Sequence, residues 1–253
     1  MKFSLIIPTR DRPVLFHRTI ESIFTHTYQK RDIEIVVVCD NDDPVSQAYV
    51  KDAIYKWPAL SMRLLTRERT EFSNRDYYNW AADQAFGDLI WIFADDLEIV
   101  KFNWDVVIWE GYQQAKRSRT DNVFCLSIKD NTPVPRHDMP KFPCFPMFTR
   151  ECRAFFGWWL HPVPPNWGVD YICYQIMNPS RSIINFHDDN FLNHISYHTH
   201  QVPTDATGAR IGNIFNKLKM IPKFNTDRIL QEEVPELRKK LQEHISFLNK
   251  KEQ

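Results

Sequence analysis

The feature that most constrains the fold of this chain is an alternation of short apolar runs with helical patterns over its first hundred residues. The apolar runs have the length and the β-branched content of buried strands, and they lie at residues 3–9, 32–40, 62–66 and 89–93. Helical patterns fill the intervals, at residues 12–26, 43–57 and 73–87. This alternation predicts an α/β fold with a mainly parallel sheet covered by helices on both faces.

Polar residues stand directly after three of the predicted strands, and they are Thr9, Arg10, Arg12, Asp40, Asp95 and Asp96. Parallel sheets bind ligands at the carboxyl ends of their strands, so this edge is the predicted site. The adjacent carboxylates Asp95 and Asp96 suit a divalent cation that also touches a phosphate. On an extended strand they would point to opposite faces, so only one would be a direct ligand unless the chain turns there.

Composition excludes several classes of function. Lys plus Arg and Asp plus Glu both number 32, and this zero net charge argues against a general nucleic-acid-binding protein. Five cysteines without a CxxC pair indicate a reducing compartment rather than a disulfide framework or a cysteine zinc site. The apolar runs are too short for a signal peptide or a membrane span. We therefore expect a cytoplasmic protein, and peripheral contact with a membrane stays open.

Three stretches, SLIIPTRDRP, IEIVVVCDNDDP and NWAADQAFGDLIWIFADDLEI, resemble the nucleotide-sugar-binding half of family 2 glycosyltransferases with the GT-A fold. The third is the most specific, and its matching positions are Asn79, Ala81, Ala85, Gly87, Asp88, Asp95 and Asp96. The resemblance covers residues 3–100 well and continues more weakly to about residue 207. It implies a GT-A domain over residues 1–224, with a donor half (1–100) and an acceptor half (101–224). A C-terminal helical extension (225–253) would follow.

The resemblance also assigns roles to residues at the sheet edge. It places the nucleotide sugar beside Thr9, Arg10, Arg12, Asp40, Arg75, Asn79 and Asp95. Asp40 would hydrogen-bond the base, commonly uracil, and Arg75 would approach the diphosphate or the base. The family's acidic signature is usually Asp-x-Asp, whereas this chain has Ala94-Asp95-Asp96. Asp96 then matches the usual metal ligand, for Mn²⁺ or Mg²⁺, and Asp95 takes the variable middle place.

An inverting transfer needs a general base near the acceptor hydroxyl. The resemblance places this base in the stretch PPNWGVDYICYQI, where Asp170 precedes a predicted helix. The alternative is that Asp170 only caps that helix, with Glu151 and Asp138 as further candidates for the base. The tryptophans around this loop would either stack on sugar rings or belong to the core, and they are Trp158, Trp159 and Trp167.

Four histidines lie within fourteen residues of the acceptor half, at positions 187, 194, 198 and 200. A zinc site would favour two histidines at helical spacing beside a glutamate, or a cysteine nearby, and these histidines have neither. The resemblance instead implies that His194 completes the metal site, with His187 and His198 behind it. The glycine-containing segment 204–213 is then expected to act as a lid over the donor.

Together these features predict transfer of a sugar from a nucleoside diphosphate donor, UDP-linked, to the hydroxyl of a glycan or another acceptor. Two alternatives stay open. A nucleotidyltransferase uses a similar sheet but would need a glycine-rich phosphate loop after the first strand, and PTRDRPVLF has no glycine. A catalytically silent nucleotide-sugar- or glycan-binding protein on the same fold would be consistent with Ala94 in place of the first aspartate.

Overall fold

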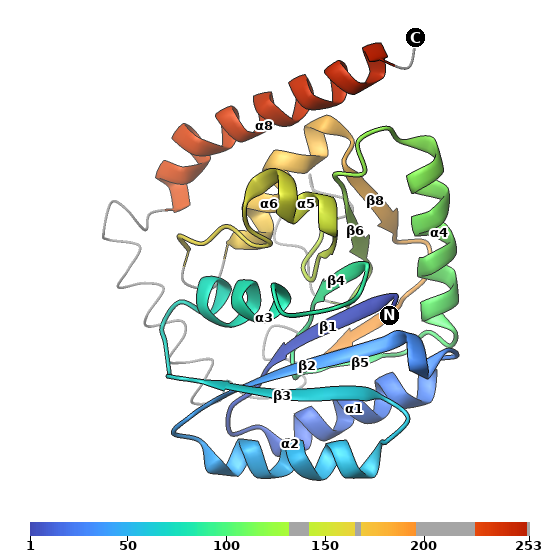
Figure 1. The fold of residues 1–253 in the computed structure, drawn as a ribbon, viewed down its shortest axis with the longest axis vertical. Helices are drawn as coiled ribbons and strands as arrows, with labels where there is room; N and C mark the ends of the chain where they lie inside the picture. Colours follow the sequence, from blue (N-terminus) through green and yellow to red (C-terminus); the bar gives the residue numbers. More distant parts are fainter. Residues whose placement is uncertain (132–141, 165–167, 196–225, 252–253) are drawn as a thin grey trace.

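The first half of the chain folds into the parallel sheet that the alternation predicts (Figure 1). Its strands are β1 (Phe3–Pro8), β2 (Ile33–Asp40), β3 (Ser61–Arg67) and β4 (Leu89–Ile92). They lie in the order β3-β2-β1-β4, and all three pairings are parallel. The connecting elements are α1 (Pro13–His26), the 3-10 turn η1 (Lys30–Asp32), α2 (Pro44–Lys56), the π-helical segment η2 (Asn74–Asn79) and the short α3 (Trp80–Ala82). The computed structural model describes residues 1–131, 142–164, 168–195 and 226–251.

The second half extends the same sheet with strands of mixed direction. They are β6 (Cys125–Ile128), β7 (Met147–Thr149) and β8 (Ile183–Phe186), in the order β4-β7-β6-β8. β7 is antiparallel to both of its neighbours, and β8 is parallel to β6. A separate two-stranded antiparallel sheet joins β5 (Leu97–Ile99) to β9 (Leu192–His194). The helices of this half are α4 (Trp104–Ser118), α5 (Arg150–Phe156), α6 (Val169–Met177), the 3-10 turn η3 (Asn178–Ser180) and α8 (Thr226–Lys251).

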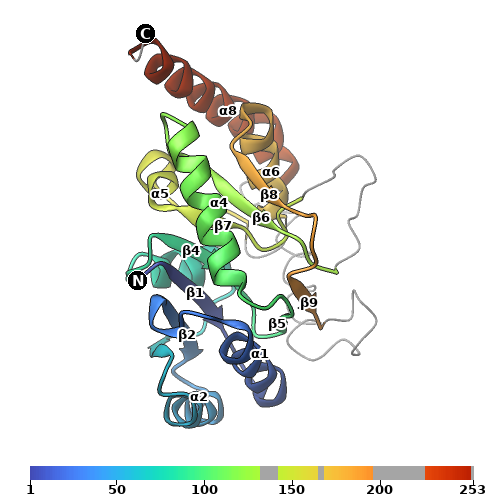
Figure 2. The ribbon, with the colours of Figure 1, turned by 90° about the vertical axis from the view of Figure 1, so that its right-hand side faces the viewer.

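Helices cover both faces of the large sheet, and this explains why its central strands are apolar throughout (Figure 2). Side chains of β1 and β2 point alternately to two cores. Leu5 and Ile35 pack with α1, α2 and α4 on one face. Ile6 and Val36 pack with α3, α5, α6 and α8 on the other. None of the described helices is both long and apolar enough to cross a bilayer.

The C-terminal helix α8 is continuous through Pro235, although a proline inside a helix commonly breaks it or begins a second one. The apolar side chains Ile229, Val234 and Leu241 are buried in the core that includes α6. These contacts hold the helix on both sides of the proline and offset the loss of one backbone hydrogen bond. The C-terminal extension therefore packs on the acceptor half rather than standing apart from it.

Gly87 is required where the chain enters β4. A Cβ at this position would lie 2.6 Å from the backbone of both Phe3 and Ser4. Such a distance is far inside van der Waals contact, so only glycine fits this crossing without displacement. The Gly87 amide donates to Ser4 Oγ at 2.8 Å, and the preceding amide, of Phe86, donates to buried Glu34 at 2.8 Å. These bonds fix the register of β4 against β1, and this register determines where the acidic residues after β4 lie.

Candidate active site

The two carboxylates at the end of β4 have different environments. The strand ends at Ile92, and the chain turns at Asp95 and Asp96 before it enters β5. Asp95 is 4% exposed and points inward, where it accepts hydrogen bonds from Thr9 Oγ1 at 2.8 Å and Arg12 Nη1 at 3.0 Å. Burial raises the pKa of Asp95 to about 6, against the opposing charge of Arg12. Asp95 thus anchors the loop after β1 to the end of β4.

Asp96 is less deeply buried than Asp95, with its side chain 13% exposed, and it meets a histidine from the second half of the chain. Its Oδ1 lies 3.5 Å from His194 Nε2, and its Oδ2 lies 3.5 Å from Arg12 Nη1. The pairing of β5 with β9 causes this approach, because Leu97 is the register partner of His194. The backbone amide of Ile195 also donates to the Asp96 carbonyl at 2.8 Å. The structure therefore brings together the two residues predicted to hold the metal.

The side chain of His194 is held in place and little exposed. The ring of Phe145 meets it edge-on, with centroids 5.0 Å apart, and the His194 amide donates to Asn131 Oδ1 at 2.6 Å. A carboxylate oxygen suits both Mn²⁺ and Mg²⁺, whereas an imidazole nitrogen suits a transition metal such as Mn²⁺ better than Mg²⁺. Among the described residues, no group of three or more His, Cys, Asp or Glu is arranged to hold a metal. The pair therefore fits a cation that takes its remaining ligands from phosphates and water.

The end of β2 carries a second charged cluster, centred on Asp40. This carboxylate is 5% exposed and accepts hydrogen bonds from Arg10 Nη1, at 2.7 Å, and from the hydroxyl of Tyr77. Arg10 also donates to Asp42 Oδ1 at 2.7 Å, and the two carboxylates raise the pKa of its guanidinium. Tyr77 was not among the residues predicted from the sequence, because no motif marks it. Only the packing of η2 against the sheet shows that it reaches Asp40.

Arg75 and Asn79 lie on η2, but their recorded contacts are made elsewhere. Arg75 is largely exposed and forms a two-pronged ion pair with the neighbouring Asp76. Asn79 is buried; its amide donates to the Leu160 carbonyl at 2.7 Å, and its oxygen accepts from the amides of Trp159 and Leu160. Asn79 therefore ties the loop after α5 to η2. A role in donor binding stays a prediction for both residues.

Asp170 is the second residue of α6 rather than its N-cap, and its roles as general base or as a group that stabilises the helix terminus both stay predictions. The capping position belongs to Gly168, whose φ of 84° lies in the left-handed region, and the helix begins at Val169. Asp170 Oδ1 accepts a hydrogen bond from the amide of Tyr171 at 2.8 Å. Burial raises the pKa of Asp170 to about 6, which suits a group that exchanges a proton near neutral pH.

Some of the other residues suggested by the sequence make contacts within the fold, and the rest lie outside the described residues. Trp159 is buried in the core, whereas Trp158 is half-buried and stacks on Phe156 with centroids 5.0 Å apart. Glu151 lies 4.0 Å from Lys116 on the outside of α5, and His187 Nε2 shares a 2.8 Å hydrogen bond with Ser127 Oγ. Four candidates lie outside the described residues, and they are Asp138, Trp167, His198 and the segment 204–213.

Comparison with known proteins places this geometry in a family. The family model described as glycosyl transferase family 2 matches residues 4–133, just over half of the chain. The O-antigen biosynthesis protein RfbC of Myxococcus xanthus is 30% identical over 125 residues, which are 49% of this chain and 9% of that protein. The chain therefore spans only a small part of this relative.

Solved structures share the fold at low sequence identity. Residues 1–349 of TarS from S. aureus in complex with UDP give a TM-score of 0.59 at 13% identity, covering 99% of this chain and 90% of that one. The mannosyltransferase PcManGT from Pyrobaculum calidifontis, in complex with GDP-Man and Mn²⁺, gives 0.59 at 16% identity, covering 96% and 73%. The expected GT-A architecture is thereby confirmed. The chain belongs to glycosyl transferase family 2.

Proposed function

We propose that this protein is a glycosyltransferase that uses a UDP-linked sugar, transfers it to an acceptor hydroxyl with inversion, and is assisted by Mn²⁺ or Mg²⁺. The observation that carries the proposal is the approach of Asp96 and His194 to 3.5 Å at the end of the central strand, beside Arg12. TarS binds UDP, and PcManGT binds GDP-Man with Mn²⁺, on a similar fold. These ligands support a nucleoside diphosphate donor and a divalent cation here.

Asp96 and His194 would hold the cation, which when bound neutralises charge on the departing diphosphate. Arg12 adds a fixed positive charge at the same place, because Asp95 accepts from its guanidinium at 3.0 Å. Thr9 supports this arrangement by donating to the other oxygen of Asp95. The buried carboxylate of Asp95 thus positions Arg12, and we propose that the less deeply buried Asp96 contacts the cation.

Asp40 is the group that we propose hydrogen-bonds the base of the nucleotide. A carboxylate accepts hydrogen bonds, and the N3–H of uracil is a donor of matching chemistry. Tyr77 holds one oxygen of Asp40, while Arg10 reaches the other and also pairs with exposed Asp42. Asp42 offers Arg10 a second partner, so Arg10 could shift when the base arrives, and Asp40 would then keep the hydrogen bond from Tyr77 and gain one from the base.

Asp170 is the proposed general base. It would accept the proton of the acceptor hydroxyl while that oxygen bonds to the anomeric carbon of the donor sugar. The bond from this carbon to the diphosphate oxygen breaks at the same time, and its electron pair leaves with the diphosphate. A pKa of about 6 keeps most of the carboxyl ionised at neutral pH and therefore able to accept a proton.

The test is release of the nucleoside diphosphate from a panel of UDP- and GDP-sugars, with Mn²⁺ or with EDTA, in the presence of candidate acceptors. We expect turnover with a UDP-sugar that EDTA abolishes. Asp170→Asn should retain donor binding and lose transfer, whereas Asp189→Asn, an exposed carboxylate paired with Lys101, should behave like the wild type. Binding of a nucleotide sugar that ignores EDTA, with no turnover of any donor, would instead favour a silent binding protein.

A further inference from the structure

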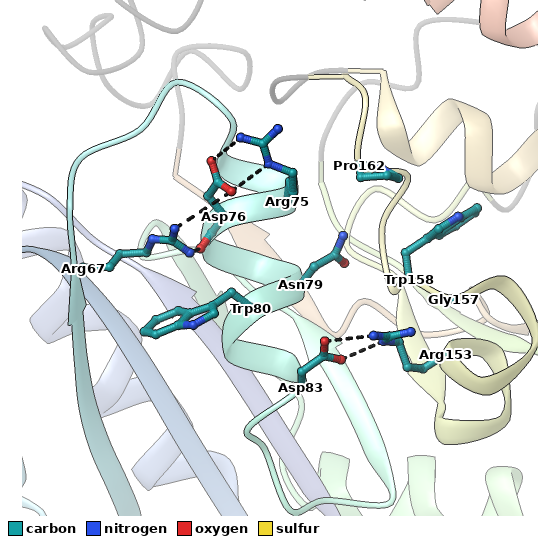
Figure 3. A pocket seen from close by; sticks show the side chains of 10 residues that line it. All are labelled: Arg67, Arg75, Asp76, Asn79, Trp80, Asp83, Arg153, Gly157, Trp158 and Pro162. Carbon is teal, nitrogen blue, oxygen red and sulfur yellow. Dashed lines mark hydrogen bonds and ion pairs between the residues drawn. The ribbon is translucent and has the colours of Figure 1, made fainter.

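A pocket of about 410 Å³ lies along η2 and α3, between the end of β3 and the loop after α5 (Figure 3). Its volume lies within the range of small-molecule sites. Ten residues line it, and those that carry the argument are Arg67, Arg75, Trp80, Asp83, Arg153 and Trp158. They come from the end of β3, from η2 and the turn after α3, and from α5 and the loop after it, so the pocket is built by both halves of the chain.

The pocket does not include the acidic turn after β4 or the Asp40 cluster, although Arg67 is the register partner of Asp40. Two of its residues, Arg75 and Asn79, are ones that the resemblance assigned to the donor, so competition by UDP decides whether the two sites are distinct. Arg75, Asn79 and Asp83 recur every four residues and form one stripe that faces the loop after α5 (Figure 3). Tyr77 lies on a different side of η2, where it bonds Asp40. No residue of the acidic turn at Asp95 lines the pocket.

The pocket has an excess of positive charge and of hydrogen-bond donors. It contains three arginines but only two carboxylates, and both carboxylates are already engaged. Asp83 receives two bonds from Arg153, at 2.7 and 3.0 Å, and a third from the Trp159 indole at 2.9 Å. Arg75 engages both oxygens of Asp76. Arg67 Nη2 also lies 4.0 Å from Asp76 Oδ1, so three cations share two carboxylates and the net positive charge favours an anionic ligand.

Arg67 strengthens this conclusion. Its Nε is buried and has no hydrogen-bond partner within the described part of the chain. Its guanidinium lies over the ring of Trp80, 4.9 Å from the centroid, and donates to the carbonyl of Asp76. An orphaned buried donor costs free energy, and an anionic ligand in this pocket would offset that cost.

Aromatic rings border the same pocket on two sides. Trp80 stands on the β3 side and Trp158 on the α5 side, and both are half-buried (Figure 3). Trp158 is supported from behind by Phe156, which stacks on it. Tryptophan rings pack well on the apolar faces of sugars, so the pocket combines a sugar-binding surface with an anion-binding one.

We infer that this pocket binds an anionic saccharide, one that carries a phosphate or a carboxylate, at a site distinct from the donor edge. In a glycosyltransferase such a site would hold a part of the acceptor away from the reacting hydroxyl. The inference depends on the pocket alone and not on the proposed donor or metal.

The ion pair between Asp83 and Arg153 allows a test in which replacing either partner should change the affinity for an anionic sugar in opposite directions. Arg153→Gln removes a cation from the pocket, so it should weaken binding of glucose 6-phosphate or glucuronate about tenfold. Asp83→Asn removes the competing carboxylate and releases Arg153 for the ligand, so it should tighten binding about threefold. A purely structural role of the pair would make both variants weaken binding. The control, Arg18→Gln, removes a comparably exposed arginine that pairs with Glu98 on β5.

Binding to the full chain would be measured by NMR titration with glucose 6-phosphate, glucuronate and glucose, up to tens of millimolar, with and without saturating UDP. We expect an anionic probe to bind at least tenfold more tightly than glucose and to be unaffected by UDP, and the better anion identifies phosphate or carboxylate as the source. If Arg153→Gln fails to fold, Arg153→Lys, which keeps the charge but not the two-pronged geometry, should bind with intermediate affinity.

The inference is overturned if no probe binds, if glucose binds as well as the anions, or if UDP displaces them. It is also overturned if Arg153→Gln and Asp83→Asn change the affinity in the same direction. UDP binding is measured in a separate titration. If the protein does not bind UDP, the proposed donor is wrong, but binding of the anionic sugars would still depend on Arg153. The two proposals can therefore be distinguished.

Discussion

The raised pKa of Asp170 makes a quantitative prediction for the pH dependence of transfer. Burial raises this pKa from 3.8 to about 6, so about nine tenths of the carboxyl is ionised at pH 7 and about one tenth at pH 5. Only the ionised form accepts a proton, so kcat should fall about tenfold between pH 7 and pH 5. A carboxyl with its ordinary pKa would stay ionised over this range and give a flat profile.

Replacing Asp170 with asparagine should change activity and stability in opposite directions. Its pKa is higher in the folded protein than in the unfolded chain, so the carboxyl stabilises the fold only when protonated. Ionisation therefore disfavours folding above about pH 6 and has no effect well below about pH 4. The shift corresponds to at most about 3 kcal/mol. Asp170→Asn should thus unfold at a higher temperature than the wild type at pH 8, and at nearly the same temperature at strongly acidic pH.

The assay measures kcat with saturating donor and acceptor from pH 5 to pH 8, together with thermal unfolding at each pH. Asp95 also has a pKa of about 6, but it acts through Arg12 on the donor, so its titration should appear in the KM of the donor. A flat kcat profile would refute the role of Asp170. So would an acidic limb that persists in Asp170→Asn, or a lower unfolding temperature of this variant at pH 8.

Three further predictions concern the entry into β4 and the ligand-binding edge of the sheet. Gly87→Ala should lower the free energy of unfolding by about 1–3 kcal/mol, because its Cβ would meet the backbone of Ser4, and an unchanged denaturant midpoint would contradict this. Asp96→Ala should weaken Mn²⁺-dependent UDP binding by about tenfold or more in calorimetry, and wild-type affinity would count against the metal role. Tyr77→Phe should weaken UDP binding about threefold to tenfold by loosening Asp40, without changing its dependence on Mn²⁺.

Local patterns in the sequence were enough to predict the first half of the fold. The apolar runs that became β1 and β2 are buried on both faces, and this is why they show no alternation. The run before Asp95 ended earlier than expected, at Ile92, because the chain turns there into β5. The acidic residues and Arg12 were correctly placed at one edge, since the carboxyl ends of parallel strands meet there.

Contacts between distant segments could not be read from the sequence in the same way. The bond of Tyr77 to Asp40 and the three bonds of Asn79 to the loop after α5 depend on how η2 packs. The continuity of α8 across Pro235 depends on burial against α6. In each case tertiary contacts supply the free energy that stabilises the observed arrangement, and local periodicity and helix propensity carry no information about such contacts.

The sequence by itself determined the parallel sheet, its two covered faces and the acidic edge, because burial leaves a pattern in neighbouring residues. Only the tertiary structure decided that Asp95 and Asp96 both contact Arg12 and that Asp96 alone of the two also meets His194. It also brought Arg153 to Asp83 in the pocket along η2 and α3. The pairing of two three-residue strands, β5 and β9, creates the contact between Asp96 and His194, and strands so short carry almost no signal of their partner.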